Sequence, residues 1–288
     1  MADNPSSFGP APEELASLPI AFAPELFKGK VALVSGAGSG IGLAIATLFA
    51  RLGASLVICG RDPAKLTNAS DFLTGLGADV TAVPMSIRDP EAVDRLIDTA
   101  SGGQGLDILV NNAGGQFPQD ALNISKKGWN AVVDTNLNGT WYMMQSAAQR
   151  WVAQGRPGTI VNIVADIWRG MPQVAHTCAA RAGVIYLSKS VAVEWSPHGI
   201  RVNCVAPGMI ESTGFRVYPP EASARFAASN PMLRCGSPWD IAGAVAYLAG
   251  PTGAFLNGEV ITVDGGQQMW GDVWPAGEPE YFKKARVV

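Results

Sequence analysis

The sequence predicts a single-domain, doubly wound α/β fold, with a seven-stranded parallel sheet and helices on both of its faces. Two observations lead to this prediction. Short apolar runs rich in β-branched residues recur along the 288 residues, and helical patterns separate them without an intervening linker. Parallel strands that are covered on both faces are near-continuously apolar, and strand–helix alternation gives right-handed crossovers. The expected strands cover residues 31–34, 56–59, 80–84, 108–110, 159–164, 201–205 and 259–263.

The connecting segments carry the spacing of amphipathic helices. Their apolar residues recur every three or four positions and so share one face, which would pack on the sheet. Two such stripes are Ile41, Ile45, Leu48, Phe49 and Leu52 in the first connection and Val184, Leu187, Val191 and Trp195 in a later one.

Three segments fall outside this alternation and bound the domain, which we place at residues 29–268. Residues 1–28 lack the basic-then-apolar plan of a signal peptide, and we expect them to form an N-terminal arm. Residues 209–237 follow a strand and include three prolines, so this irregular stretch lies where a substrate lid is expected. Residues 269–288 form an aromatic tail of the kind that packs on its own or a neighbouring subunit.

The composition excludes several classes of function. A net charge of −3 with 16 % charged residues does not indicate a nucleic-acid partner, and no apolar run approaches the roughly 20 residues that span a bilayer. The widely spaced Cys59, Cys178, Cys204 and Cys235 indicate reduced thiols, which predicts a cytoplasmic location. No His/Cys cluster has metal-ligand spacing, so we expect no metal.

A glycine-rich loop follows the first expected strand. Residues 31–42 read Val-Ala-Leu-Val-Ser-Gly-Ala-Gly-Ser-Gly-Ile-Gly, and an apolar helical pattern comes next. Glycine permits a tight turn and a close ligand, and the N-terminus of a helix presents free N–H groups and a positive dipole. Because the loop lies between a strand and a helix, it predicts a phosphate-binding turn.

Further motifs follow in a fixed order: Asn-Asn-Ala-Gly at 111–114, Asn136, Pro207-Gly208 and Asp-Gly-Gly at 264–266. With the glycine loop, they resemble the short-chain dehydrogenase/reductase family over nearly the whole chain. The resemblance implies a Rossmann fold, a nicotinamide dinucleotide cofactor and hydride transfer. The expected cofactor-binding residues are Gly36, Ser39, Gly40, Ile41, Gly42, Arg61, Ser86, Ile87, Asn112, Ala113, Gly114, Arg181, Pro207, Gly208, Ile210 and Ser212.

The sequence departs from the family at its catalytic positions. The family uses a Tyr-x-x-x-Lys pair and a serine, whereas this chain has Thr177 and Arg181 at the pair and Asp166 near the serine position. An arginine can still bind ribose hydroxyls, but an aliphatic hydroxyl is a far weaker acid than a phenol. Proton delivery to an alkoxide, as ordinary ketone reduction requires, is therefore compromised.

One branch of the family tolerates this loss. Residues 111–117, 128–143 and 174–184 are similar to peroxisomal trans-2-enoyl-CoA reductases and, more loosely, to 2,4-dienoyl-CoA reductases. Reducing a C=C bond conjugated to a thioester places charge on the thioester oxygen, so hydrogen-bond donors matter more than a strong local acid. The prediction is an NADP-dependent reductase of an activated C=C bond in a small molecule such as an acyl thioester. Two alternatives are an alcohol or ketone dehydrogenase with an atypical proton donor and a non-catalytic NADP-binding homologue.

The candidate catalytic residues are Gln116, Asn136, Asp166, Thr177 and Arg181, and each has a structural alternative. The Gln116 amide would donate to a substrate carbonyl or stabilise its loop. Asn136 resembles the family's helix asparagine, which binds backbone and water. Thr177, with its neighbour His176, would face the nicotinamide or cap the helix. Asp166 must be protonated, paired with an arginine or turned away, because an ionised carboxylate disfavours an enolate.

Arg61 carries the choice of cofactor. It follows the second expected strand, whose end is Cys59-Gly60 where NAD-binding relatives place an acid. An arginine just beyond suits a 2′-phosphate, which favours NADP over NAD. Asp62 argues against NADP, since its carboxylate would repel that phosphate.

The chain is expected to form a homo-oligomer, either a dimer or a tetramer. In relatives, the helices that bear Asn136 and Arg181 form shared four-helix interfaces. Trp141, Met144 and Trp151 are also large for a solvent-facing helix surface.

Overall fold

The computed structural model describes residues 8–269 and 276–277. Within them a seven-stranded sheet has the order β3-β2-β1-β4-β5-β6-β7, and all neighbouring strands pair in parallel. This confirms the predicted doubly wound sheet, in which the strand order reverses between β1 and β4. The strands are β1 (Val31–Ser35), β2 (Ser55–Gly60), β3 (Val80–Pro84), β4 (Ile108–Asn111), β5 (Gly158–Ile163), β6 (Ile200–Pro207) and β7 (Val260–Val263).

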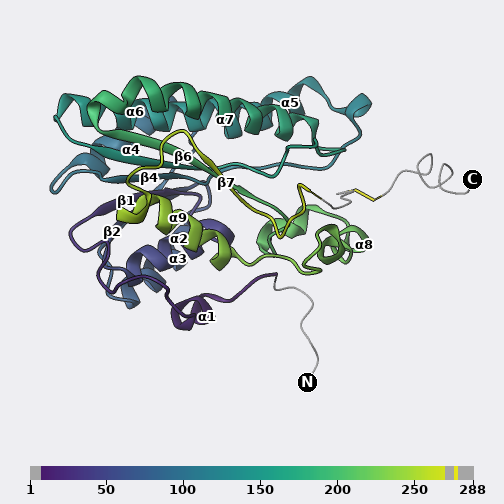
Figure 1. Cartoon of the computed structure of the whole chain (residues 1–288), viewed down its shortest axis with the longest axis horizontal. Helices are drawn as coiled ribbons and strands as arrows, with labels where there is room; N and C mark the ends of the chain where they lie inside the picture. Colours follow the sequence, from purple (N-terminus) through teal and green to yellow (C-terminus); the bar gives the residue numbers. More distant parts are fainter. Residues whose placement is uncertain (1–7, 270–275, 278–288) are drawn as a thin grey trace, which may run out of the picture.

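Helices cover both faces of the sheet, as predicted (Figure 1). The expected stripe of α2 packs in one core, where Phe49 is fully buried, and the opposite core contains Trp151. None of the described helices is long and apolar enough to cross a membrane. One layer comprises α1 (Pro12–Ser17), α2 (Gly40–Arg51), α3 (Pro63–Gly75) and α9 (Pro238–Ala249), and the other α4 (Pro90–Ser101), α5 (Lys126–Val133), α6 (Gly139–Ala153) and α7 (Ala175–Trp195).

The edge strands differ from the central ones. All residues of β1 and β4 are buried, whereas the residues of β3 and β7 are partly exposed. The expectation that strands are covered on both faces therefore holds for the centre of the sheet and not for its edges. An edge strand has a neighbour on one side only, so its backbone and side chains remain accessible.

One argument for oligomerisation is wrong. Met144 and Trp151 are 0 % exposed and lie in the core between α4, α6 and the sheet, with the Trp151 indole donating a 2.7 Å hydrogen bond to the Leu106 carbonyl. Trp141 is half-buried and stacks on Trp195 of α7. The large side chains of α6 thus fill the core, because this helix turns their face toward the sheet. Oligomerisation itself stays a prediction.

The N-terminal residues that the structure describes pack on the α2–α9 layer. Leu15 of α1 is buried, its carbonyl accepts a hydrogen bond from Arg51, and the Pro19 carbonyl accepts one from the indole of Trp239. Residues 8–28 are therefore held to the domain surface. Of the expected aromatic tail, only residues 269, 276 and 277 fall within the described ranges.

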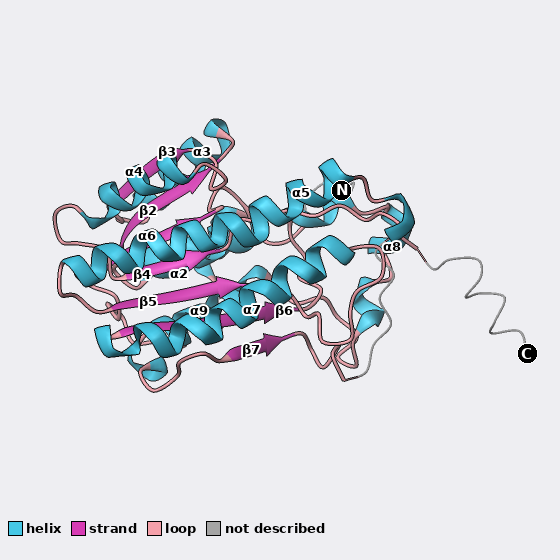
Figure 2. Ribbon diagram, turned by 90° about the horizontal axis from the view of Figure 1, so that it is seen from above, coloured by secondary structure: helices cyan, strands magenta, loops and turns pink. Residues whose placement is uncertain are grey.

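The carboxyl ends of the strands point to one side of the molecule, where α5 and α8 also lie (Figure 2). The segment 209–237 lies there too, and we call it the lid. It is less irregular than expected, because it contains the short helix α8 (Pro220–Ser223) and 3₁₀ turns at Thr213–Val217 and Phe226–Ser229. It also has its own apolar cluster, formed by Met209, Phe215, Ala222 and Phe226.

Candidate active site

The glycine loop between β1 and α2 requires its glycines. Gly36 and Gly40 have φ of 69° and 56°, in the left-handed region that side chains disfavour. A Cβ on Gly42 would lie 2.3 Å from the Gly36 carbonyl oxygen, and one on Gly36 would lie 2.9 Å from the Ala113 Cα. The Asn112 amide donates hydrogen bonds of 3.0 and 3.3 Å to the Ser35 and Gly36 carbonyls. The loops after β1 and β4 therefore form one close-packed unit at the reversal of strand order.

Two adjoining cavities open at this edge of the sheet and share Ser39, Arg61, Asn112 and Gly114. The β2 cavity, of about 230 Å³, lies at the ends of β1, β2 and β3. The lid cavity, of about 540 Å³, lies under the lid. Of the predicted site residues, Gly36, Ser39, Arg61, Ser86, Ile87, Asn112, Ala113 and Gly114 line the β2 cavity. Ser39, Gly40, Ile41, Arg61, Asn112, Gly114, Gln116, Asn136, Asp166, Thr177, Arg181, Pro207, Gly208, Ile210 and Ser212 line the lid cavity.

Gly42 lines neither cavity. It packs directly against the Gly36 carbonyl, so its role is to let the glycine loop and α2 approach each other closely. Trp168 also lines neither cavity: it is 45 % exposed and its indole donates a hydrogen bond to the Thr262 hydroxyl.

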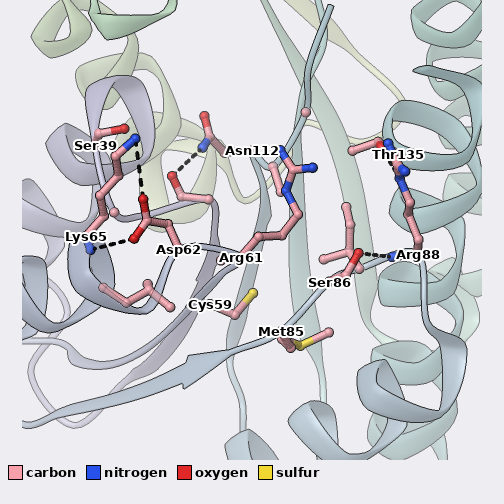
Figure 3. Close-up of a pocket in the computed structure, with 17 residues that line it drawn as sticks. Ser39, Cys59, Arg61, Asp62, Lys65, Met85, Ser86, Arg88, Asn112 and Thr135 are labelled. Atoms are coloured by element: carbon pink, nitrogen blue, oxygen red, sulfur yellow. Dashed lines mark hydrogen bonds and ion pairs between the residues drawn. The ribbon is translucent and has the colours of Figure 1, made fainter. Parts of the chain in front are cut away.

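The β2 cavity brings cations together (Figure 3). Arg61 extends into the cavity, with Lys65 on one side and Arg88 on the other. The Asp62 carboxylate caps α3 by accepting from the Lys65 N–H and lies 3.8 Å from the Lys65 ammonium. The Lys65 ammonium thus partly neutralises the negative charge of Asp62, so Asp62 would repel a 2′-phosphate less than the sequence alone suggests. The strand β2 ends at Gly60 with no carboxylate.

Lys65 and Arg88 were not predicted from the sequence. Lys65 lies in the first turn of α3 beside Asp62, and Asp62 followed by Pro63 could have been read as a helix start. Arg88 follows β3 and hydrogen-bonds to Thr135 and to the Ala131 carbonyl, which ties it to the opposite helix layer. No local pattern indicates that contact.

Arg181 is a buried cation at the floor of the lid cavity. It is 8 % exposed, and its Nη1 donates a 2.9 Å hydrogen bond to the Ile163 carbonyl. A Cβ on Gly114 would lie 2.3 Å from its Nη2, so only glycine permits this approach. Burial lowers the pKa of Arg181 to about 10. Among the described residues no carboxylate forms an ion pair with it, and the Ile163 carbonyl accepts its hydrogen bond.

Asn136 holds the loop that carries Gln116. It lies in a π-helical turn, Asp134–Asn138, between α5 and α6. Its Oδ1 accepts from the Gly115 N–H and its Nδ2 donates to the Gly115 carbonyl, both at 2.9 Å. Both polar ends of the amide are thus committed to backbone, as the resemblance implied in part. Asn136 is a positioning residue for Gly115 and Gln116.

Asp166 lines the lid cavity and is only 7 % exposed. Burial, assisted by the nearby charge of Asp264, raises its pKa to about 6 from an ordinary 3.8, against the opposing effects of a Trp168 N–H and Arg169. Of the outcomes expected for this side chain, an ion pair with Arg181 is not among the ion pairs of the described residues, and the raised pKa brings protonation within reach near neutral pH. A carboxyl group with this pKa can give or take a proton near neutral pH.

Thr177 and His176, at the start of α7, have different surroundings. The helix begins at Ala175 with Val174 at its N-cap, so Thr177 is not the cap. Thr177 lines the lid cavity, whereas the fully buried His176 packs edge-on against Phe117 and lines neither cavity. The His176 Nδ1 accepts from the Thr177 N–H at 2.8 Å, and burial lowers the pKa of the ring, which keeps it neutral.

Tyr218 is a further residue that the sequence did not single out. It comes from the lid, lines the lid cavity and accepts a hydrogen bond from the Gln116 amide. The sequence placed it only within a segment that could form a cavity wall, because nothing local fixes the course of the lid. Tyr142 of α6 is half-buried, packs against the α4–α6 core and lines neither cavity.

Comparisons with known proteins agree with this geometry. A short-chain dehydrogenase model described as "Enoyl-(Acyl carrier protein) reductase" matches residues 36–268. The chain is 37 % identical over 246 residues to a probable 2,4-dienoyl-CoA reductase of Bacillus subtilis, covering 83 % of this chain and 97 % of the relative. It is 38 % identical over 254 residues to the peroxisomal 2,4-dienoyl-CoA reductase of Rattus norvegicus, covering 86 % and 87 %.

A solved structure has the same fold. It is a putative 2-deoxy-D-gluconate 3-dehydrogenase of Agrobacterium tumefaciens with bound NADP, which superposes with a TM-score of 0.78 at 34 % identity over 86 % of this chain and 100 % of that one. The match to the family model, over residues 36–268, includes the glycines of the loop after β1 and the whole lid. The chain therefore belongs to the short-chain dehydrogenase/reductase family and is an NAD(P)-dependent oxidoreductase.

Proposed function

We propose that this protein is an NADP-dependent reductase of a C=C bond conjugated to a carbonyl, with an enoyl thioester or a similar compound as substrate. The observation that carries the proposal is the buried Arg181 guanidinium, which has no carboxylate partner among the described residues and lines the same cavity as the Gln116 amide. A buried cation of this kind stabilises a negative charge that develops beside it.

The residues around the cavities fit the cofactor. The left-handed glycines and the close approach of the loops after β1 and β4 leave a cradle that side chains would fill. The loop leads into the N-terminus of α2, which suits a pyrophosphate. Arg61 and Lys65 suit a 2′-phosphate, and the A. tumefaciens structure contains NADP. When bound, the nicotinamide dinucleotide supplies the hydride.

The chain's own residues act on the substrate. As hydride adds to the β-carbon, the π electrons of the C=C bond form a new double bond between the α-carbon and the carbonyl carbon. The π pair of the C=O bond moves to oxygen, which gives an enolate. Arg181 and Gln116 would stabilise that oxygen, while Asn136 holds the Gln116 loop through Gly115. Asp166 would then supply a proton to the α-carbon of the enolate, either directly from its protonated carboxyl group or through a water molecule. The net change adds one hydride and one proton across the C=C bond.

Turnover of 2-enoyl and 2,4-dienoyl thioesters with NADPH tests this proposal. The relatives from B. subtilis and rat are named 2,4-dienoyl-CoA reductases, so this class is measured first. We expect Arg181→Gln to lower kcat by about 100-fold, as loss of one oxyanion-stabilising group does, and Arg181→Lys to restore part of it. Reduction of simple ketones together with no turnover of any thioester would contradict the proposal.

A second candidate is an alcohol or ketone dehydrogenase with an unusual acid. The raised pKa of Asp166, about 6, favours it, because this carboxyl group could replace the missing phenol. If the missing acid limits ketone reduction, the double substitution Thr177→Tyr with Arg181→Lys should raise that activity. No gain would mean that the missing phenol does not limit ketone reduction.

We infer a homo-oligomer, a dimer or tetramer, from the family resemblance. The four cysteines are all free thiols, which suits a reducing compartment such as the cytoplasm.

A further inference from the structure

We propose that Tyr218 of the lid is a catalytic residue, which donates a hydrogen bond to the substrate carbonyl oxygen while Gln116 holds its hydroxyl in place. This inference rests on the proposed function, since it takes that carbonyl to belong to the reduced substrate.

The direction of the Gln116–Tyr218 hydrogen bond supports this role. The Gln116 Nε2 donates to the Tyr218 Oη, and both side chains line the lid cavity. A phenol has one proton to donate and lone pairs to accept with. Since Gln116 occupies an acceptor site on the hydroxyl oxygen, the proton remains to be donated to a group in the cavity. An accepted hydrogen bond also makes the phenol a better donor.

The lid holds the Tyr218 ring in a fixed orientation. The ring packs edge-on against Phe226 with centroids 5.1 Å apart and against Phe215 at 6.4 Å. Phe215 and Phe226 are themselves buried in the apolar cluster of the lid. Burial raises the pKa of Tyr218, with the hydrogen bond from Gln116 acting against this rise, so the phenol stays neutral and keeps its proton. The hydroxyl is thus a positioned, protonated donor.

No other described tyrosine can take this role. Tyr142 packs in the α4–α6 core, and Tyr186 and Tyr247 are 69 % and 41 % exposed on α7 and α9. None of these three lines the lid cavity. The chain has Thr177 where the family has its phenol, yet it brings a phenol into the same cavity from the lid. A carbonyl bound between Arg181 and Tyr218 would thus meet donors from both the sheet edge and the lid.

The placement of Tyr218 links lid position to chemistry. Gln116 comes from the loop after β4, and Tyr218 comes from the segment after β6. The pair joins only when the lid lies over the cavity, as it does in this structure. We therefore expect the full donor set to assemble only with the lid closed, which would keep the hydride-accepting site from forming in the open protein.

The test is Tyr218→Phe, which removes the hydroxyl and keeps the ring that packs on Phe215 and Phe226. We expect kcat for the enoyl thioester to fall by about 100-fold, with KM and NADPH affinity changed by less than about threefold, as for loss of one oxyanion donor. Tyr247→Phe, on the exposed face of α9, is the matched control and should keep wild-type kcat. Thermal unfolding of both variants shows whether the fold is retained.

A second variant tests the hydrogen bond between Gln116 and Tyr218 without changing the aromatic rings of the lid. Gln116→Leu should also lower kcat, because it removes the group that holds the Tyr218 hydroxyl and a second donor near the substrate carbonyl. The loss in the double variant should be smaller than the product of the two single losses, because the two side chains are hydrogen-bonded to each other. Wild-type kcat in Tyr218→Phe, or a loss confined to KM, would overturn the inference.

The outcomes also separate this inference from the proposed function. Enoyl turnover that is unaffected by Tyr218→Phe would leave the proposed function intact and remove Tyr218 from the mechanism. If the wild-type protein reduces ketones and not enoyl thioesters, the proposed function fails, and the same variant measured on the ketone decides whether Tyr218 contacts its carbonyl. If the protein reduces neither class, both proposals fail.

Discussion

At the scale of single residues, burial shifts the pKa values of Arg181 and Asp166, which both line the lid cavity, in opposite directions. It lowers the pKa of Arg181 to about 10, which still leaves the guanidinium charged at neutral pH. It raises the pKa of Asp166 to about 6, which brings the carboxyl group within reach of protonation. The cavity thus contains a guanidinium that stays charged at neutral pH and a carboxyl group that can change its protonation state near neutral pH. This combination suits a reaction that creates an oxyanion and then consumes a proton.

The first prediction concerns the stability cost of Asp166. Because the folded protein binds this proton more tightly than the unfolded chain, stability falls as pH rises from about 4 to about 6 and remains reduced above that range. Asp166→Asn lacks this cost. Its unfolding free energy relative to wild type should therefore be higher at pH 7.5 than at pH 4, by roughly 1 to 3 kcal/mol.

Urea unfolding at the two pH values measures this difference. Asp71→Asn, at an exposed position of α3, is the matched control and should change stability little at either pH. An equal effect of Asp166→Asn at pH 4 and pH 7.5 would mean that the carboxyl group is not destabilised by burial.

Sequence reasoning found the residue types of the site but not all of their roles. Gln116, Thr177 and Arg181 were identified from the positions they occupy relative to the family motifs, and all three line the lid cavity. Tyr218 could not be found in this way. Its role depends on a contact across 102 positions of the chain, and the lid sequence has no period that fixes its path.

At the scale of elements, the site depends on the turn between β1 and α2 and on the lid. The turn is set by local sequence, since its glycines are required by left-handed backbone and by contacts with the loop after β4. The lid is held by its own cluster of Phe215, Phe226 and their neighbours. The first element was therefore predictable from residues 31–42, whereas the short helices of the second depend on packing that the sequence pattern does not reveal.

The second prediction tests the turn. In Gly42→Ala the new Cβ would lie 2.3 Å from the Gly36 carbonyl and 2.5 Å from the Asn112 amide, and the backbone of this close-packed unit cannot yield cheaply. We expect cofactor affinity, measured by fluorescence titration, to fall by about 10-fold or more, equivalent to at least about 1.4 kcal/mol.

Gly243→Ala is the matched control for this substitution. Gly243 lies inside α9, and a methyl group there would have no neighbouring atom within 4 Å. Alanine should therefore raise stability by about 0.5 to 1 kcal/mol without affecting cofactor binding. Unchanged cofactor affinity in Gly42→Ala would show that the turn can relax around a methyl group.

At the scale of the whole molecule, the strand order reverses between β1 and β4, and both cavities open at that edge. This follows from a doubly wound sheet, in which adjacent loops diverge where the order reverses. The seven strands were predicted to within about two residues at most ends, because apolar runs and turn residues bound them. The orientation of α6 was not: periodicity alone did not show that Met144 and Trp151 face the sheet.

The third prediction concerns cofactor choice, which depends on charges contributed by separate elements. Arg61→Ala should lower kcat/KM for NADPH by about 10-fold or more and leave the value for NADH within about threefold, because one charge-assisted phosphate contact is lost. Arg95→Ala, at an exposed position of α4, is the control and should change neither value. An equal fall with both cofactors would contradict a role of Arg61 in binding the 2′-phosphate.

The most direct measurement of the central claim is the product formed from compounds that distinguish the two reactions. An α,β-unsaturated ketone and an enoyl thioester of matched chain length, each incubated with NADPH and the protein, can be analysed by mass spectrometry and NMR. We predict saturation of the C=C bond with the carbonyl intact, with one hydrogen from the cofactor on the β-carbon and one from solvent on the α-carbon. An allylic alcohol from the ketone, with the C=C bond retained and no product from the thioester, would contradict the account.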